Sequence, residues 1–175
     1  MLIGLMGKAG AGKDSVADVL CRKHGFDRYA MAKPLKAMLA TIGFPEPPRE
    51  LKESLIPGFT FSWRTAAQTL GTEWGRGLDP DLWLKLAEQA IVTATRDLVI
   101  TDIRFPNELA LIRRYGGITM AVVGRESKLD ATNASHASEA SDIAMLGLQY
   151  INNDGTLDDL EYVVRAALMM ASARS

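Results

Sequence analysis

The chain has 175 residues, which is room for one domain of ordinary size with its own hydrophobic core. Its 20 Lys and Arg residues against 21 Asp and Glu residues give a formal net charge of -1, which excludes a general electrostatic attraction to nucleic acid. The single cysteine excludes an internal disulfide framework, and no apolar run is long enough to span a membrane. We therefore expect a cytoplasmic protein without a nucleic-acid or membrane partner.

The first elements expected along the chain are a buried strand, a loop and a helix. The apolar run "LIGLM" at 2–6 predicts the strand, and "DSVADVLCRKHG" at 14–25 has helical apolar spacing and ends in a capping glycine. The loop between them reads Gly-Lys-Ala-Gly-Ala-Gly-Lys, which is the G-x-x-x-x-G-K pattern of a P-loop. Backbone N–H groups of such a loop bind phosphates at a helix N-terminus, and Lys13 would reach the β- and γ-phosphates.

The residue after Lys13 departs from the P-loop pattern, which continues with Ser or Thr on Mg²⁺. Asp14 stands there, and Ser15 follows one place late. Asp14 is either part of a Mg²⁺ site, with Ser15 as the competing hydroxyl ligand, or a first-turn residue that complements the helix dipole. The expected nucleotide-binding residues of the loop are Gly7, Lys8, Gly10, Ala11, Gly12, Lys13, Asp14 and Ser15.

The stretch from about residue 32 to residue 96 is mostly helical in pattern and holds all three tryptophans. We interpret it as substrate-binding machinery. Its Pro-rich, charged part "GFPEPPRELKESLIPGF" is interpreted as an insertion, because both flanks fit one α/β pattern. The expected helical acceptor-binding insertion covers about 44–96.

The second half of the chain alternates strands and helices. Strands are expected at "LVITDIRF" (98–105), "ITMAVVG" (118–124) and "LQYIN" (148–152), with helices at 106–117 and 156–171. This alternation predicts an α/β fold in which a parallel sheet carries helices on both faces.

Two charged residues lie near the carboxyl end of the strand expected at 98–105. Asp102 stands at its carboxyl end, where open α/β sheets bind ligands, and is placed like a Walker-B acid that holds Mg²⁺ directly or through water. Arg104 can supply a bidentate donor to a phosphate. The alternative is that Asp102 caps the next helix and Arg104 lies on a solvated turn.

The stretch "GRESKLDATNASHASEASD" lacks hydrophobic periodicity, and we interpret about 125–142 as a lid. Arg125, at the start of the lid, is the expected charge clamp. His136 and Glu139 lie further along, and a lone histidine such as His136 is more often a surface residue than a catalyst.

Several motifs together resemble one family over nearly the whole chain. "GKAGAGKDSVAD", "RTAAQTLGTEWGR", "DPDLWL", "VITDIRFPNELALI", "HASE" and "INNDGTLDDL" occur in the order found in phage-type deoxynucleoside monophosphate kinases, relatives of the adenylate-kinase group. The resemblance implies a three-layer P-loop nucleoside monophosphate kinase fold. It also implies that Asp14 is a family trait, since the family's loop ends in Lys-Asp followed by Ser or Thr.

The resemblance also implies roles for single residues. Lys13 would serve the ATP phosphates, and Asp14, Ser15 and Asp102 would surround Mg²⁺. Asn152 would pack against adenine, and core packing is expected for Trp74 more than for Trp83. One departure is that the uncharged Thr65 follows Arg64, where a second basic residue would fit the acceptor phosphate. The residues expected to hold the acceptor nucleotide are Arg64, Gln68, Gly71, Thr72, Trp83 and Arg104.

The expected activity is transfer of the γ-phosphoryl group of ATP to a deoxynucleoside 5′-monophosphate in the presence of Mg²⁺. A homodimer and a monomer both stay open. Two alternatives stay open. One is a related small-molecule phosphate kinase of the phosphomevalonate kinase type, which shares a Gly-Lys-Asp loop. The other is a nucleotide-binding module without turnover.

Overall fold

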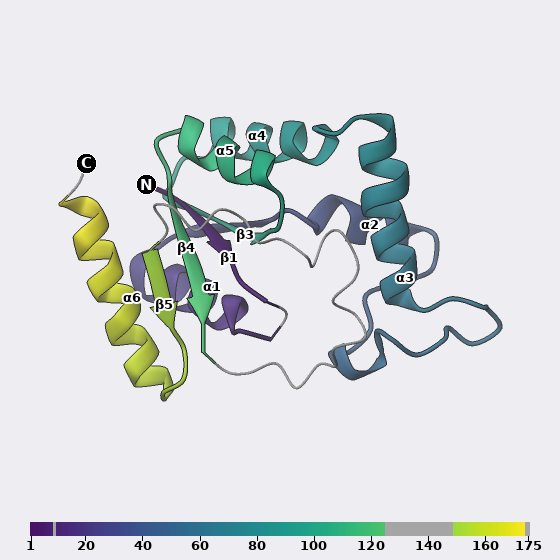
Figure 1. Cartoon of the computed structure of the whole chain (residues 1–175), viewed down its shortest axis with the longest axis horizontal. Helices are drawn as coiled ribbons and strands as arrows, with labels where there is room; N and C mark the ends of the chain where they lie inside the picture. The colour runs from purple at the N-terminus through teal and green to yellow at the C-terminus, as the bar shows by residue number, and fades with distance from the viewer. Residues whose placement is uncertain (9, 125–148, 174–175) are drawn as a thin grey trace. The chain divides into compact units, whose positions relative to one another are not determined.

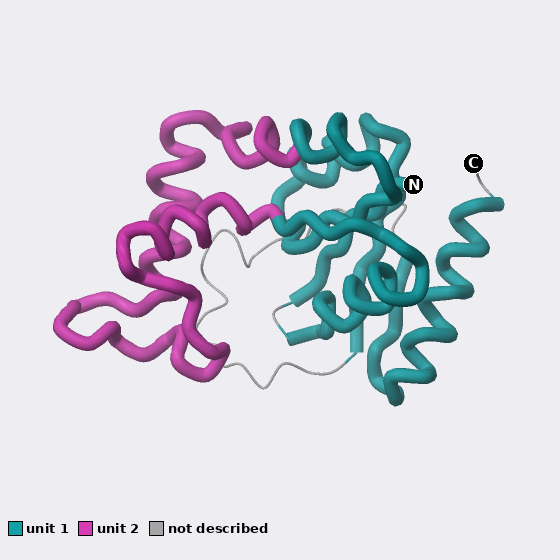
Figure 2. The backbone as a smooth tube through the Cα atoms, turned by 180° about the vertical axis from the view of Figure 1, so that it is seen from behind, with its two compact units in different colours: residues 1–30, 88–175 teal, residues 31–87 magenta. Residues whose placement is uncertain are grey.

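The computed structural model describes residues 1–8, 10–124 and 149–173, which contacts divide into two compact units. The first unit is formed by Met1–Ala30 and the chain from Glu88 onward, and the second by Met31–Ala87 (Figure 2). The second unit begins and ends earlier than the insertion predicted at about 44–96. The predicted lid, with Arg125, His136 and Glu139, lies outside the described residues.

The first unit is built on a five-stranded sheet in which all neighbouring strands are parallel. The order is β2-β3-β1-β4-β5, so the first strand lies at the centre (Figure 1). The strands are β1 (Leu2–Met6), β2 (Asp27–Ala30), β3 (Leu98–Ile103), β4 (Ile118–Val123) and β5 (Gln149–Asn152).

The edge strand β2 was not expected from the sequence. Its four residues, "DRYA", include two charged side chains and none is fully buried, because only one neighbouring strand covers it. A short, charged edge strand is typical of sheets that avoid edge-to-edge association, and it has no apolar run to reveal it.

Helices cover both faces of this sheet, which confirms the predicted α/β fold (Figure 1). On one face, α1 (Lys13–His24) contacts β1, β2 and β3, and it packs against α6 (Leu157–Ser172). On the other face, α5 (Pro106–Arg114) contacts β1 and β4. The central strand is therefore buried from both sides, which explains its uninterrupted apolar sequence.

The two faces of β1 are packed differently. Ile3 and Leu5 belong to the core under α1 and α6, together with apolar side chains of the other strands. Gly4 points to the α5 face, where an added Cβ would lie 2.5 Å from Cδ1 of Ile103 and 2.9 Å from Cγ1 of Ile112. Glycine is thus required there by close packing. The core residues under α1 and α6 include Val16, Val19, Leu20, Val99, Met120, Val122, Ile151, Leu160 and Val164.

The second unit is mostly helical, as the sequence predicts. It contains α2 (Lys33–Thr41), η1 (Arg49–Leu51), α3 (Trp63–Gln68) and η2 (Thr69–Arg76), and α4 (Leu82–Thr93) begins in it and ends in the first unit. The segment η2 is a π-helix, a form that is rare and concentrates at functional sites.

The tryptophans of this unit correct one expectation. Trp63 and Trp83 are buried, whereas Trp74, the one expected in the core, is 44% exposed. Gly75 makes room for Trp83, because a Cβ at position 75 would overlap the indole ring of Trp83. It is therefore Trp83 that packs against this turn of η2, while Trp74 lies largely in solvent.

No helix within residues 1–8, 10–124 and 149–173 is long and apolar enough to cross a membrane.

We expect Gly4→Val to lower the free energy of unfolding by about 1–3 kcal/mol, because the added methyl groups collide with Ile103 and Ile112. Urea unfolding measures this change. The matched control is Gly77→Ala, since a Cβ at Gly77 meets no atom within 4 Å and its φ of -68° suits alanine. Equal stability of Gly4→Val and wild type would show that β1 and α5 are not packed as described.

Candidate active site

The glycine loop between β1 and α1 has a backbone that only glycine adopts readily. Gly7, Gly10 and Gly12 have φ values of 143°, 87° and 93°. A Cβ at Gly7 would also lie 2.5 Å from the backbone oxygen of Val122 in β4. Without side chains at these positions, the loop's N–H groups can approach a phosphate closely at the start of α1.

The loop is held in place by a buried asparagine that follows β5. Asn153 is 2% exposed, and its Nδ2 donates a hydrogen bond to the carbonyl oxygen of Ala11 at 2.9 Å. Its own backbone N–H donates to Val123 O at 2.8 Å. A Cβ at Gly12 would overlap the same amide nitrogen, so loop and side chain fit each other closely.

The sequence favoured Asn152, not Asn153, as the nucleotide-binding residue of "INNDGT". Asn152 is exposed, while Ile151 and Asn153 are buried. The alternation along β5 was the signal that could have found Asn153, since Ile151 points into the core and the residue two positions later shares its burial. The predicted contact of Asn152 with adenine stays a prediction.

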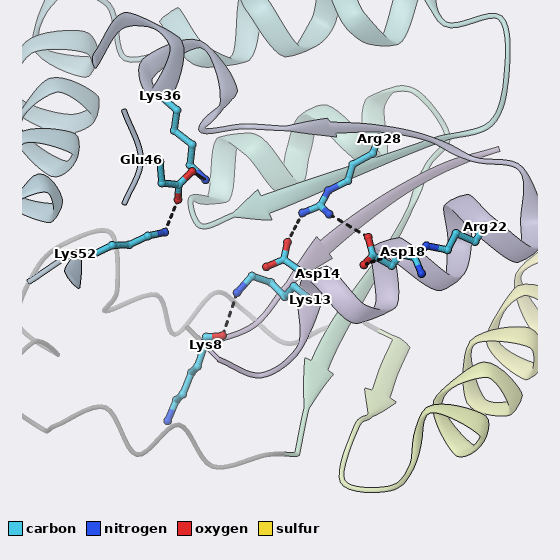
Figure 3. Close-up of polar contacts among 9 residues, drawn as sticks. All are labelled: Lys8, Lys13, Asp14, Asp18, Arg22, Arg28, Lys36, Glu46 and Lys52. Carbon is cyan, nitrogen blue, oxygen red and sulfur yellow. Dashed lines mark hydrogen bonds and ion pairs between the residues drawn. The ribbon is translucent and has the colours of Figure 1, made fainter. Parts of the chain in front are cut away.

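Lys13, the first residue of α1, turns back over the loop. Its Nζ donates to Gly7 O at 2.8 Å and to Lys8 O at 3.0 Å (Figure 3). The ammonium group thus lies against carbonyl oxygens of the loop and adds a full positive charge to that end of α1.

Asp14 forms an ion pair that the sequence did not reveal. Its carboxylate accepts a hydrogen bond from Arg28, which belongs to β2 and also lies 3.6 Å from Asp18 one turn further along α1 (Figure 3). The charge of Asp14 is therefore compensated by the chain itself. Arg28 was missed because β2 was missed.

Asp102 lies at the carboxyl end of β3, as predicted, in an unusual backbone conformation. Its φ is 64°, and it is the one non-glycine residue with positive φ in the part of the chain that the structure describes. Between Gly4 and Met6 of β1, the partner strand advances three residues, from Ile100 to Ile103. This extra residue is a β-bulge, and bulges beside active sites redirect a side chain. The strained conformation marks Asp102 as a candidate functional residue.

The helix after Asp102 is capped by another carboxylate. Glu108 is 4% exposed and accepts hydrogen bonds from the backbone N–H groups of Arg104 at 2.7 Å and Phe105 at 3.1 Å. The cap of α5 therefore does not need Asp102, which removes the capping alternative for this residue. Glu108 also fixes the backbone that carries Arg104.

The remaining predicted residues lie in the second unit. Arg64 forms an ion pair with Glu53, and Gln68, Gly71 and Thr72 are half-buried along α3 and η2. Trp83 is 4% exposed and its Nε1 donates to Gly71 O at 2.7 Å. This placement favours packing for Trp83, and its predicted contact with a base stays untested.

Metal ligands are predicted at Asp102 and Asp14. Within residues 1–8, 10–124 and 149–173, no three His, Cys, Asp or Glu side chains gather as a group that could hold a metal ion. The phosphates of a nucleotide are a source of further oxygen ligands for a divalent ion at Asp102 or Asp14.

The sequence matches the family model described as deoxynucleotide monophosphate kinase over residues 50–164, more than half of the chain. The chain belongs to the deoxynucleotide monophosphate kinase family. The resemblance seen in the sequence is thereby confirmed. The matched residues begin after the glycine loop, so the loop geometry is an observation separate from the family match.

A relative and two solved structures extend this comparison. The deoxynucleoside-5′-monophosphate kinase of Escherichia phage T5 is 38% identical over 98 residues, which are 52% of this chain and 39% of that protein. TT1252 from Thermus thermophilus has a TM-score of 0.58 at 22% identity, with 97% of each chain covered. A shikimate kinase from Aquifex aeolicus has a TM-score of 0.58 at 11% identity over the full length of both chains. These structures share the fold, and they confirm the expected P-loop kinase architecture.

We expect Asn153→Ala to loosen the glycine loop, because the carbonyl of Ala11 loses its buried donor. The free energy of unfolding should fall by about 1–3 kcal/mol, and affinity for a non-hydrolysable ATP analogue should fall about tenfold or more. Urea unfolding and calorimetric titration measure the two effects.

The neighbouring variant Asn152→Ala provides the comparison. Asn152 is exposed, so its substitution should change stability by less than about 0.5 kcal/mol. If Asn153→Ala matched wild type in both stability and nucleotide affinity, the amide would not be holding the loop.

Proposed function

We propose that this chain transfers the γ-phosphoryl group of ATP to the 5′-phosphate of deoxynucleoside monophosphates, in the presence of Mg²⁺. The observation that carries the proposal is the family match over residues 50–164. The glycine loop supports it independently, because its positive-φ glycines and Lys13 suit a nucleoside triphosphate.

The loop and Lys13 are assigned to ATP. The loop's N–H groups would bind the phosphates at the N-terminus of α1. The Lys13 ammonium would give up its hydrogen bonds to the carbonyl oxygens of Gly7 and Lys8 and would donate to the β- and γ-phosphate oxygens instead. Asn153 keeps Ala11 O turned away from these oxygens by its hydrogen bond.

Asp102 is assigned to Mg²⁺, with Asp14 or Ser15 as the second contact. Their carboxylate and hydroxyl oxygens are ligands that this hard cation prefers. The chemistry that the ion would supply when bound is neutralisation of the charge that develops during transfer. Asp14 would have to exchange Arg28 for the metal, so Ser15 remains its competitor for this role.

The acceptor is assigned to Arg64, Gln68, Gly71 and Thr72 of the second unit, and Arg104 keeps its predicted role as a bidentate donor to a phosphate. During transfer, an acceptor phosphate oxygen forms a bond to the γ-phosphorus while the bond from that phosphorus to the ADP oxygen breaks. The attacking oxygen is already ionised, so the chain needs no general base. Its residues align the two phosphates and neutralise charge.

The family match favours this function over a phosphomevalonate-type kinase and over a module without turnover. The test is ADP release measured with each of the four deoxynucleoside monophosphates, with the matching ribonucleotides, and with phosphomevalonate. We expect release with at least one deoxynucleotide. Release with phosphomevalonate alone, or nucleotide binding without any turnover, would overturn the proposal.

We expect Lys13→Ala to lower kcat/KM on the order of 10³-fold or more, because the ammonium stabilises charge on the transferred phosphoryl group. The coupled ADP assay measures this loss, and circular dichroism checks that the helices are retained. Wild-type kinetics in a folded Lys13→Ala protein would refute the role of the loop.

We expect Asp102→Asn to lower kcat at saturating Mg²⁺ about 100-fold, because the amide removes the negative charge that holds the metal. Asparagine tolerates positive φ well, so the free energy of unfolding should change by less than about 1 kcal/mol. Mg²⁺ titrations and urea unfolding of the same preparations separate the two effects. Loss of stability without loss of Mg²⁺-dependent turnover would make Asp102 a structural residue.

A further inference from the structure

A second group of charged residues lies within the second unit. The carboxylate of Glu46 forms ion pairs with two lysines, Lys36 at 3.0 Å and Lys52 at a shorter distance (Figure 3). We call Lys36, Glu46 and Lys52 the Glu46 cluster. Its members come from α2 and from the segment between α2 and α3, so they are brought together only by folding.

The Glu46 cluster rests on a rigid aromatic base. The ammonium of Lys52 lies 5.3 Å from the ring centre of the buried Trp63, a cation–π distance. Trp63 Nε1 donates to Phe44 O at 3.0 Å, two residues before Glu46. The Phe44 ring packs edge-to-face on Phe59 and Phe61, with centroids 5.1 Å and 5.7 Å away. These contacts tie the Pro-rich segment to the start of α3.

The cluster also adjoins the predicted acceptor residue. The backbone N–H of Arg64 donates to Lys52 O at 3.0 Å, and the Arg64 side chain pairs with Glu53. Lys36 and Lys52 thus pair with the same carboxylate, that of Glu46, while Arg64 pairs with Glu53. The local charge is positive although the chain as a whole is nearly neutral.

Glu46 stays ionised at neutral pH. Partial burial alone would raise the pKa of its carboxyl, but hydrogen bonds from Lys52 and Lys36 outweigh burial and lower that pKa below its ordinary value. One carboxylate thus holds two ammonium groups. If Lys52 formed an ion pair with another anion, Glu46 would still be paired with Lys36, so the carboxylate would keep a cationic partner.

We infer that Lys52 is a further phosphate-binding cation for the acceptor, in addition to Arg64 and Arg104, and that Glu46 and Trp63 position it. The inference rests on the proposed function, because it requires a monophosphate as acceptor. A dianionic phosphate has three terminal oxygens, more than one guanidinium can satisfy. Lys52 supplies the second positive charge that the sequence lacks at the uncharged Thr65.

The test compares Lys52→Met, Lys52→Arg and the control Lys85→Met. Methionine keeps the apolar stem over Trp63 and removes the charge. Lys85 pairs with Asp79 in the same unit, so Lys85→Met breaks an exposed ion pair outside the proposed site. For each protein we would measure KM for the deoxynucleotide, KM for ATP, kcat, and inhibition by the deoxynucleoside that lacks the phosphate.

We expect Lys52→Met to raise KM for the deoxynucleotide at least about tenfold, the value of a hydrogen bond to a charged group. Its KM for ATP and its inhibition by the deoxynucleoside should stay within about threefold, and Lys52→Arg should recover most of the loss. A parallel loss of deoxynucleoside inhibition would indicate damage to the whole unit and overturn the inference.

Two further outcomes separate this inference from the proposed function. If wild type phosphorylates deoxynucleotides and Lys52→Met has a wild-type KM for them, the inference is wrong and the function stands. If wild type phosphorylates none, the proposed function fails, and the inference fails with it.

Discussion

The hydrogen bond from Asn153 to the carbonyl of Ala11 is the interaction on which the described site depends. A loop that binds phosphates must present its N–H groups and turn its carbonyl oxygens away, because those oxygens repel an anion. Ala11 O is held by Asn153, a bond that does not have to break when a phosphate binds, whereas Gly7 O and Lys8 O accept from Lys13 only until the ammonium turns to the nucleotide. Asn153 directly follows β5, the last strand in the sequence. The loop that it holds follows β1, the first strand.

Two of the acidic residues around the site, Asp14 and Glu108, are compensated by the chain. Asp14, beside the loop, forms an ion pair with Arg28. The buried Glu108 accepts hydrogen bonds from two backbone N–H groups at the start of α5. Asp102 differs, because its backbone is held at positive φ by a bulge in the otherwise regular strand β3. Strain of this kind persists only where the surrounding structure enforces it. For this reason Asp102 is the carboxylate that we consider the strongest candidate for binding a metal ion.

Local patterns were enough to predict much of the fold and site. The apolar runs of β1, β3 and β4, the glycines of the loop, and Asp102 at a strand end are all visible within a few residues of sequence. What was missed depends on distant contacts. Strand β2 is short and charged, and Arg28 was lost with it. Trp83 is buried and Trp74 is exposed, the opposite of the expected packing, because the space over Gly75 that Trp83 fills exists only in the folded unit. Asn153 could be told from Asn152 only by the side of β5 on which each lies.

The most direct test of the account is an NMR titration of the ¹⁵N-labelled chain with Mg²⁺ and a non-hydrolysable ATP analogue. We predict that the amide signals of the glycine loop and of Lys13 move most, because their N–H groups would bind the phosphates. The side-chain amide signal of Asn153 should persist, since its bond to Ala11 O is kept. Saturable binding that leaves the loop amides unmoved would contradict the account.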